Sequence, residues 1–197
     1  MTIRNVSIQK PVVIAVEGID DRFLLDYLCN SWDLNDIQFI SLNETPSFDN
    51  VSAILNMPGF HQTVKVFGII RDADERYQSA KDSVADILSR LKLGIKTAYF
   101  IFPDNKNNGM LETLLMQVSS TDVNRTKCVD AFITCLTSQS ISIPNHKEDK
   151  TKVYAYLSAF DEPGKRIGEA ASAGYWNHAN KVFNNLKQFF NDLVQSN

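Results

Sequence analysis

Three short acidic clusters in the chain each follow an apolar, β-rich segment. The first cluster, EGIDD, contains Glu17 and Asp21. The second, DAD, contains Asp72 and Asp74, and the third, PDN, contains Asp104. Carboxylates held close together repel one another and need a cation or protons to compensate. Because such oxygen ligands suit Mg²⁺ and Mn²⁺, the clusters predict a divalent-cation site if the fold brings them together.

The spacing within the clusters supports this interpretation but leaves another one open. Glu17 and Asp21 are four residues apart across a strand-to-helix turn, where Gly18 permits a backbone that other residues resist. Asp72 and Asp74 flank a turn, so both side chains can reach one ion. Each cluster alone is also compatible with a simple helix start, because aspartate is a common N-cap residue. The metal-site interpretation therefore requires the clusters to meet.

The elements that would position these residues alternate between strands and helices. Amphipathic helical segments are predicted over residues 20–32, 51–57 and 77–92, with strands before, between and after them. The predicted strands are Val12–Val16, Ile37–Leu42, Val64–Ile70 and Thr97–Phe102. This βαβαβαβ order predicts parallel strands joined by right-handed crossovers. Ligands of such sheets bind beyond the carboxyl ends of the strands, which is where the acidic clusters lie.

The remainder of the chain is predicted to be helical, over residues 110–118, 125–137, 150–159 and 179–194. The last of these helices carries a stripe of apolar and aromatic residues, which is typical of core or docking surface. We therefore predict an α/β fold: a Rossmann-like parallel sheet of about four or five strands, with a C-terminal helical elaboration. The α/β core would span residues 1–105, and residues 106–197 would form a helical extension packed on it.

Composition sets further limits. The 197 residues, 44% apolar and 22% charged, are ordinary for a globular protein, and the net charge of −3 gives no support to a nucleic-acid partner. The N-terminal apolar run is too short for a signal peptide or a membrane span, so we expect a cytoplasmic protein without membrane contact. The three cysteines and three histidines have no zinc-ligand spacing. Cys128 and Cys135, seven residues apart, are expected on one buried helix face.

The acidic motifs resemble a known domain. V-E-G-x-x-D at the end of the first strand, with D-x-D at the end of a later one, resembles the TOPRIM domain of topoisomerases, bacterial primases and overcoming-lysogenisation-defect nucleases. Its invariant glutamate matches Glu17, the acidic residue four positions further matches Asp21, and its D-x-D pair matches Asp72 and Asp74. This part of the resemblance covers roughly residues 11 to 105.

A closer resemblance extends over nearly the whole chain. VEGxxD and RDAD, together with three further motifs, are similar to an uncharacterised TOPRIM-like bacterial family. The further motifs are P-x-x-x-x-x-G-x-L-E (Pro103 to Glu112), K-x-K-x-Y-A-Y-L (Lys150–Leu157) and GEAASAGYW (Gly168–Trp176).

The resemblance implies Mg²⁺- or Mn²⁺-dependent phosphoryl chemistry on nucleic acid or a nucleotide. Asp72 and Asp74 would hold the metal, and Glu17 would ligate a metal or act as a general acid or base. Asp21 would complete or orient the site. Glu112 is a candidate further ligand, or else a charge in the first turn of a helix. Lys150 and Lys152 would bind phosphate, or else lie on a solvated surface.

Three functions remain open at this stage. The first is a metal-dependent nuclease or related phosphoryl-transfer enzyme. The second is a non-catalytic module that retains the acidic pocket and binds metal, nucleotide or nucleic acid. The third is a receiver-like phosphoacceptor, which would need a lysine at the end of a fifth strand. Nothing in the sequence activates Tyr77 as a nucleophile, and no P-loop or zinc module is present, which disfavours topoisomerase, ATPase-linked and primase chemistry.

Overall fold

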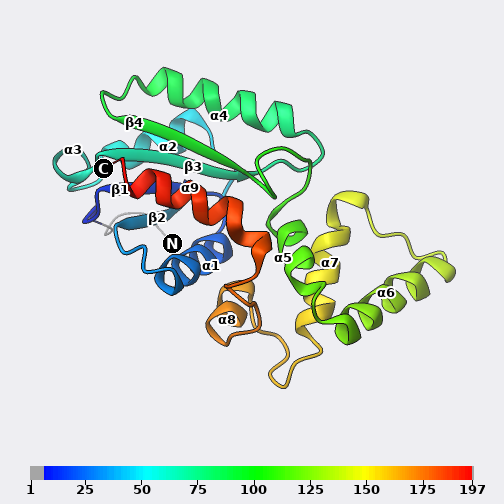
Figure 1. Cartoon of the computed structure of the whole chain (residues 1–197). Coiled ribbons are helices and arrows are strands. Elements are labelled where there is room, and N and C mark those ends of the chain that lie inside the picture. The colour runs from blue at the N-terminus through cyan, green and yellow to red at the C-terminus, as the bar shows by residue number, and fades with distance from the viewer. Residues whose placement is uncertain (1–6, 197) are drawn as a thin grey trace.

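A computed structural model describes residues 7–196, so residues 1–6 of the N-terminal segment considered above, and residue 197, lie outside the described residues. Its centre is one parallel sheet in the order β2-β1-β3-β4 (Figure 1). The strands are β1 (Val12–Val16), β2 (Ile37–Ser41), β3 (Val66–Asp72) and β4 (Lys96–Phe102). The prediction of an α/β fold with a parallel sheet of about four or five strands and a helical C-terminal part is confirmed, with four strands among the described residues.

The sheet is covered on both faces, which explains why β1 is apolar at every position. Successive side chains of a strand point to opposite faces. Val12, Ile14 and Val16 accordingly join one apolar cluster, whereas Val13 and Ala15 join a second one. The second cluster is completed by α2 (Phe48–Leu55), α3 (Phe60–Thr63) and α4 (Tyr77–Leu91).

The first cluster is completed by α1 (Ile19–Ser31) and by the helices that follow β4 in the described residues. These are α5 (Leu111–Ser119), α6 (Val123–Ser138), α7 (Asn145–Leu157), α8 (Ile167–Ser172), the 3-10 turn η1 (Lys181–Phe183) and α9 (Asn184–Val194). In Figure 1, α5, α6 and α7 lie to one side of the sheet, α8 lies next to α1, and α9 crosses back over the sheet.

The aromatic side chains of α9 fasten the C-terminal part to the sheet. Phe190 is fully buried, with its ring centroid 5.6 Å from that of Phe39 in β2. Phe189 lies 5.4 Å from Phe100 in β4. One apolar cluster therefore spans residues on both sides of position 105, and the division of the chain at that position stays a prediction.

Several local expectations differ from the structure. β3 begins at Val66 rather than Val64 and runs as far as Asp72, two residues beyond its predicted end at Ile70. α9 begins only at Asn184, because the residues before it form η1. The expectation that Cys128 and Cys135 are buried is wrong: both are exposed, because α6 buries only Val129. No helix among residues 7–196 has the length and apolar character needed to cross a membrane.

Candidate acidic functional site

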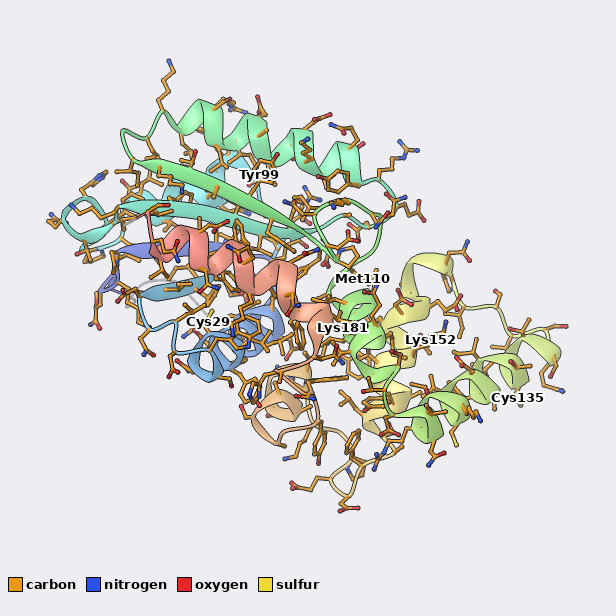
Figure 2. The ribbon with its side chains drawn as sticks, in the orientation of Figure 1. Cys29, Tyr99, Met110, Cys135, Lys152 and Lys181 are labelled. Carbon is orange, nitrogen blue, oxygen red and sulfur yellow. The ribbon has the colours of Figure 1, made fainter. Side chains whose placement is uncertain are left out.

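A cleft of about 510 Å³ lies where β1 and β3 end and the chain enters α5. Figure 2 marks Met110, one of its lining residues, where the chain passes from the sheet region into α5. The residues that line the cleft are Glu17, Gly18, Ile19, Asp20, Asp21, Asn43, Asp72, Asp74, Met110, Glu112, Lys147, Lys150, Tyr154 and Ile167. All five carboxylates predicted for the site, and one of the two predicted lysines, thus border one cleft.

Glu17 directly follows the last residue of β1 and lies beside the positively charged Arg71. Its Oε1 is 3.5 Å from Nε of Arg71, too long for a good hydrogen bond, and within the described residues this buried oxygen has no hydrogen-bond partner. Burial raises the pKa of Glu17 to about 7, Arg71 opposes the rise, and Asp21 and Asp74 add to it. A carboxylate of this kind is ready to accept a proton or a cation near neutral pH.

Asp72, at the end of β3, joins the sheet to α5. Its Oδ1 accepts a hydrogen bond of 2.9 Å from the backbone N–H of Leu111, the first residue of α5. Burial raises the pKa of Asp72 well above its usual range, and the carboxylates of Asp21, Glu17 and Glu112 raise it further. The interaction with three other carboxylates shows that the fold concentrates negative charge around Asp72.

Asp74 is held by its backbone. Its φ of 51° lies in the left-handed region, which aspartate tolerates better than most residues. Its N–H and C=O each pair with Gly109 at 2.8 Å, in an isolated antiparallel bridge. The exposed side chain of Asp74 thus projects from a fixed backbone into the cleft.

Asp21 also has a structural task. Its Oδ2 accepts a hydrogen bond of 2.8 Å from the N–H of Gly18, the residue that caps α1. The helix-start interpretation of the EGIDD cluster is therefore correct for Asp21, although the same side chain lines the cleft. Burial raises the pKa of Asp21, the Gly18 N–H opposes the rise, and Asp20 adds to it.

Glu112 comes from α5 and meets a lysine from α7. Its side chain is buried, and its Oε1 lies 3.6 Å from Nζ of Lys150. Burial raises the pKa of Glu112, whereas Lys150 lowers it. The adjacent residues also tie the two helices together, because Oγ1 of Thr113 donates to Oδ2 of Asp149 at 2.5 Å. This bond fixes α7 beside the acidic residues.

A divalent cation fits this set of residues by its donor chemistry. Two buried carboxylate oxygens in the cleft, Glu17 Oε1 and Asp20 Oδ1, have no hydrogen-bond partner among residues 7–196. A buried carboxylate oxygen without a donor is costly unless a proton or a cation compensates it. In the same described residues, however, no three acidic, histidine or cysteine side chains converge as a ready-made metal cage. The acidic side chains instead turn to separate local partners, such as Arg71, Leu111 and Lys150.

Two residues singled out in the sequence lie outside the lining of the cleft. Asp104 closes its own loop, where it accepts hydrogen bonds from the N–H groups of Lys106 and Asn107. Partial burial is outweighed by these bonds, which hold the pKa of Asp104 below its usual range. Lys152, labelled on α7 in Figure 2, pairs with Glu148 at 2.6 Å along the same helix.

Sequence reasoning missed several lining residues, of which Lys147 and Tyr154 matter most for chemistry. Both lie on α7, and no local pattern indicates which face of that helix meets the sheet edge. Asn43 follows the carboxyl end of β2, and that position was a signal which could have identified it.

The fold is shared with solved structures of OLD proteins. The chain is similar to the C-terminal region of the Xanthomonas campestris pv. campestris OLD protein, at 14% identity over 94% of this chain and 95% of that chain, with a TM-score of 0.51. The C-terminal region of the Burkholderia pseudomallei OLD protein matches at 16% identity over 95% of this chain and 100% of that chain, with a TM-score of 0.48. Such low identity shows similarity of fold alone.

No curated protein matches the sequence. One family does, over residues 11–195, which is nearly the entire chain. The chain therefore belongs to DUF3226, a family described as proteins of unknown function.

Proposed function

We propose that this protein is a Mg²⁺- or Mn²⁺-dependent phosphoryl-transfer protein with a TOPRIM-like acidic site, nuclease-like in its action on nucleic acid. The observation that carries the proposal is the cleft at the carboxyl ends of β1 and β3. There, acidic side chains from two strand ends and from α5 border the same space as Lys147 and Lys150 of α7. A phosphate diester and a divalent cation need this combination of charges.

The chain's own residues have distinct roles in this proposal. Glu17, Asp72, Asp74 and Glu112 would hold the metal, which when bound offsets negative charge on the reacting phosphate. Asp21 keeps the start of α1 in place next to Glu17. Lys150 would bind a phosphate oxygen. Partial burial lowers the pKa of Lys150, but the neighbouring Glu112 carboxylate opposes this and the pKa is raised overall, so the lysine stays charged.

The fold also supports the proposal. It resembles that of the C-terminal region of the Xanthomonas campestris pv. campestris OLD protein, and the acidic motifs of this chain resemble those of the TOPRIM domain. The net charge of −3 does not oppose it, because the cleft carries its own two lysines, and phosphate binding depends on the local field.

Cleavage assays on labelled single-stranded DNA, duplex DNA and RNA test the proposal, with Mg²⁺, Mn²⁺ or EDTA present. We expect metal-dependent cleavage that falls at least about 100-fold in Asp72→Asn and in Glu17→Gln, since each removes a ligand charge. Asp104→Asn is the matched control, because it neutralises an aspartate that follows a strand but does not line the cleft. Cleavage that survives in the Glu17→Gln, Asp72→Asn double variant contradicts the proposal.

The second candidate is a module that binds metal, nucleotide or nucleic acid in the same cleft without turnover. It is favoured because each carboxylate interacts with a different neighbouring group, and within the described residues no three of them converge on one metal position. Tight binding of Mn²⁺ or a nucleotide by calorimetry, with no cleavage of any substrate, would support this candidate. The receiver-like alternative lacks its required feature, because residues 7–196 form four strands and no fifth.

A further inference from the structure

The cleft has an aromatic residue among its charged ones. Tyr154 is 43% exposed and is one of five large apolar or aromatic side chains that are prominent on the described surface. Of those five, Tyr154 alone lines the acidic cleft. Single exposed aromatic side chains are common on protein surfaces, so what distinguishes Tyr154 is its place in the lining of the cleft.

Tyr154 shares a helix face with the two lysines of the cleft. Lys147, Lys150 and Tyr154 are spaced three and four residues apart on α7, the spacing that aligns side chains along one face of a helix. Val153 and Leu157 of the same helix are buried in the core, which fixes the rotation of α7. The aromatic ring is therefore held at the cleft by the packing of neighbouring residues on its own helix.

The remaining lining residues include apolar as well as charged side chains. Met110 and Ile167 line the cleft together with its carboxylates, its lysines and Tyr154. A nucleotide combines the same two characters, because its phosphate is charged and its base has apolar faces. Lysines next to an aromatic ring suit the phosphate and the base of one nucleotide.

We propose that Tyr154 is a stacking platform for an unpaired base adjacent to the phosphate bound by Lys150, which makes single-stranded nucleic acid the preferred substrate class. This inference rests on the proposed function and deepens it. A base inside a duplex has both faces covered by its neighbours, whereas an unpaired base can leave the stack and lie on an aromatic ring. Stacking of this kind tolerates any base, so it selects strandedness rather than sequence.

Binding to two probes of equal charge tests the inference. The probes are a ten-residue thymidine oligonucleotide and an abasic strand of the same length, measured by fluorescence anisotropy with Ca²⁺ in place of Mg²⁺. We expect the protein to bind the thymidine strand more tightly. Tyr154→Ala should weaken binding of that strand between about 5-fold and 150-fold, the range that stacking energies of 1–3 kcal/mol give, and leave the abasic strand unchanged.

Two variants separate stacking from other roles. Tyr154→Phe keeps the ring and should bind as the wild type does; if it behaves as Tyr154→Ala does, the hydroxyl group is what matters and the inference is wrong. Phe132→Ala is the control for loss of an exposed ring, because Phe132 is 44% exposed on α6 and does not line the cleft. The Phe132→Ala variant should bind both strands with the affinities of the wild type.

The outcomes for the two proposals are distinguishable. Equal wild-type affinity for both strands, or no binding of either, overturns the role of Tyr154, whatever the cleavage assays show. Metal-dependent cleavage together with equal affinities for the two strands would support the proposed function and contradict the stacking role of Tyr154. A preference for the thymidine strand that requires Tyr154, without cleavage under any condition, would support the stacking role on a non-catalytic module.

Discussion

At the scale of single residues, Glu17 shows how the fold prepares the candidate site. Its carboxyl group lies at the end of a fully buried strand, where desolvation outweighs the attraction of Arg71. The sequence was sufficient to predict Glu17, Asp72 and Asp74 at one edge of a sheet, because the ends of apolar strands are visible in a sequence. It was not sufficient to predict that Asp21 accepts a hydrogen bond from the N–H of Gly18 and Asp72 one from the first N–H of α5, since these bonds depend on exact geometry.

The raised pKa of Glu17 predicts a pH-dependent stability in metal-free protein. A carboxyl whose pKa rises from 4.5 to about 7 on folding is protonated in the folded state over that interval while it is ionised in the unfolded chain. Its contribution is therefore fully present below pH 4.5 and is lost as the pH rises through 7. The loss amounts to about 3 kcal/mol by linkage, and Glu17→Gln should abolish it.

Urea denaturation in EDTA at pH 5 and pH 8 measures this effect. Glu17→Gln should exceed the wild type in free energy of unfolding at pH 8, and the difference should be much smaller at pH 5. The control is Glu162→Gln, which alters an exposed glutamate remote from the cleft and should give wild-type pH dependence. If the stability of Glu17→Gln depends on pH as that of the wild type does, the prediction is wrong and the pH dependence arises from other carboxylates of the cleft.

At the scale of elements, the site depends on how α5 and α7 dock at the end of the sheet. The sequence was sufficient to predict that both segments are helical. It was not sufficient to predict which side of α7 faces the cleft, because tertiary packing determines the rotation of that helix. Lys147 and Tyr154 were missed for this reason, and Lys152 was chosen although it pairs with Glu148 instead. Short α3 and α8 were missed because four and six residues are too few for a periodic signal.

The bond between α5 and α7 yields a second prediction. Thr113 donates to Asp149 and accepts from the N–H of Met110 at the start of α5, so it caps one helix and holds the other. Thr113→Val keeps the shape of the side chain and removes both bonds. It should lower the free energy of unfolding by about 1–3 kcal/mol in urea denaturation.

The control for that variant is Thr137→Val. Thr137 bonds only within α6, to the carbonyl of Ile133, and is exposed, so its loss should alter stability by no more than about 0.5 kcal/mol. Equal stabilities of wild type and Thr113→Val would mean that α7 is positioned by its apolar face alone.

At the scale of the whole molecule, the sheet and the C-terminal helices share one apolar cluster. α9 covers the face of the sheet that α1 leaves open, and its aromatic rings contact Phe39 and Phe100. The alternation of strands and helices was enough to predict the parallel sheet. The return of α9 across that sheet could not be predicted, because an amphipathic stripe shows that a helix docks but not where.

The shared cluster predicts that the chain folds as one cooperative unit. Phe190→Ala should lower the free energy of unfolding by about 3–5 kcal/mol, because it leaves a cavity between α9 and the sheet. A fragment ending at residue 105 should fail to fold, since it exposes that face of the sheet. Circular dichroism and thermal denaturation of the fragment test this. A cooperative transition in the fragment would instead support residues 1–105 as an independent core.

We propose that Glu17, Asp72 and Asp74 hold a divalent cation, and anomalous diffraction from crystals soaked in Mn²⁺ tests this site. We predict an anomalous peak in the cleft, at ligand distance from Asp72, Asp74 and Glu17, which disappears in crystals of Asp72→Asn. Crystals that bind Mn²⁺ elsewhere on the surface and show none in the cleft would contradict the claim.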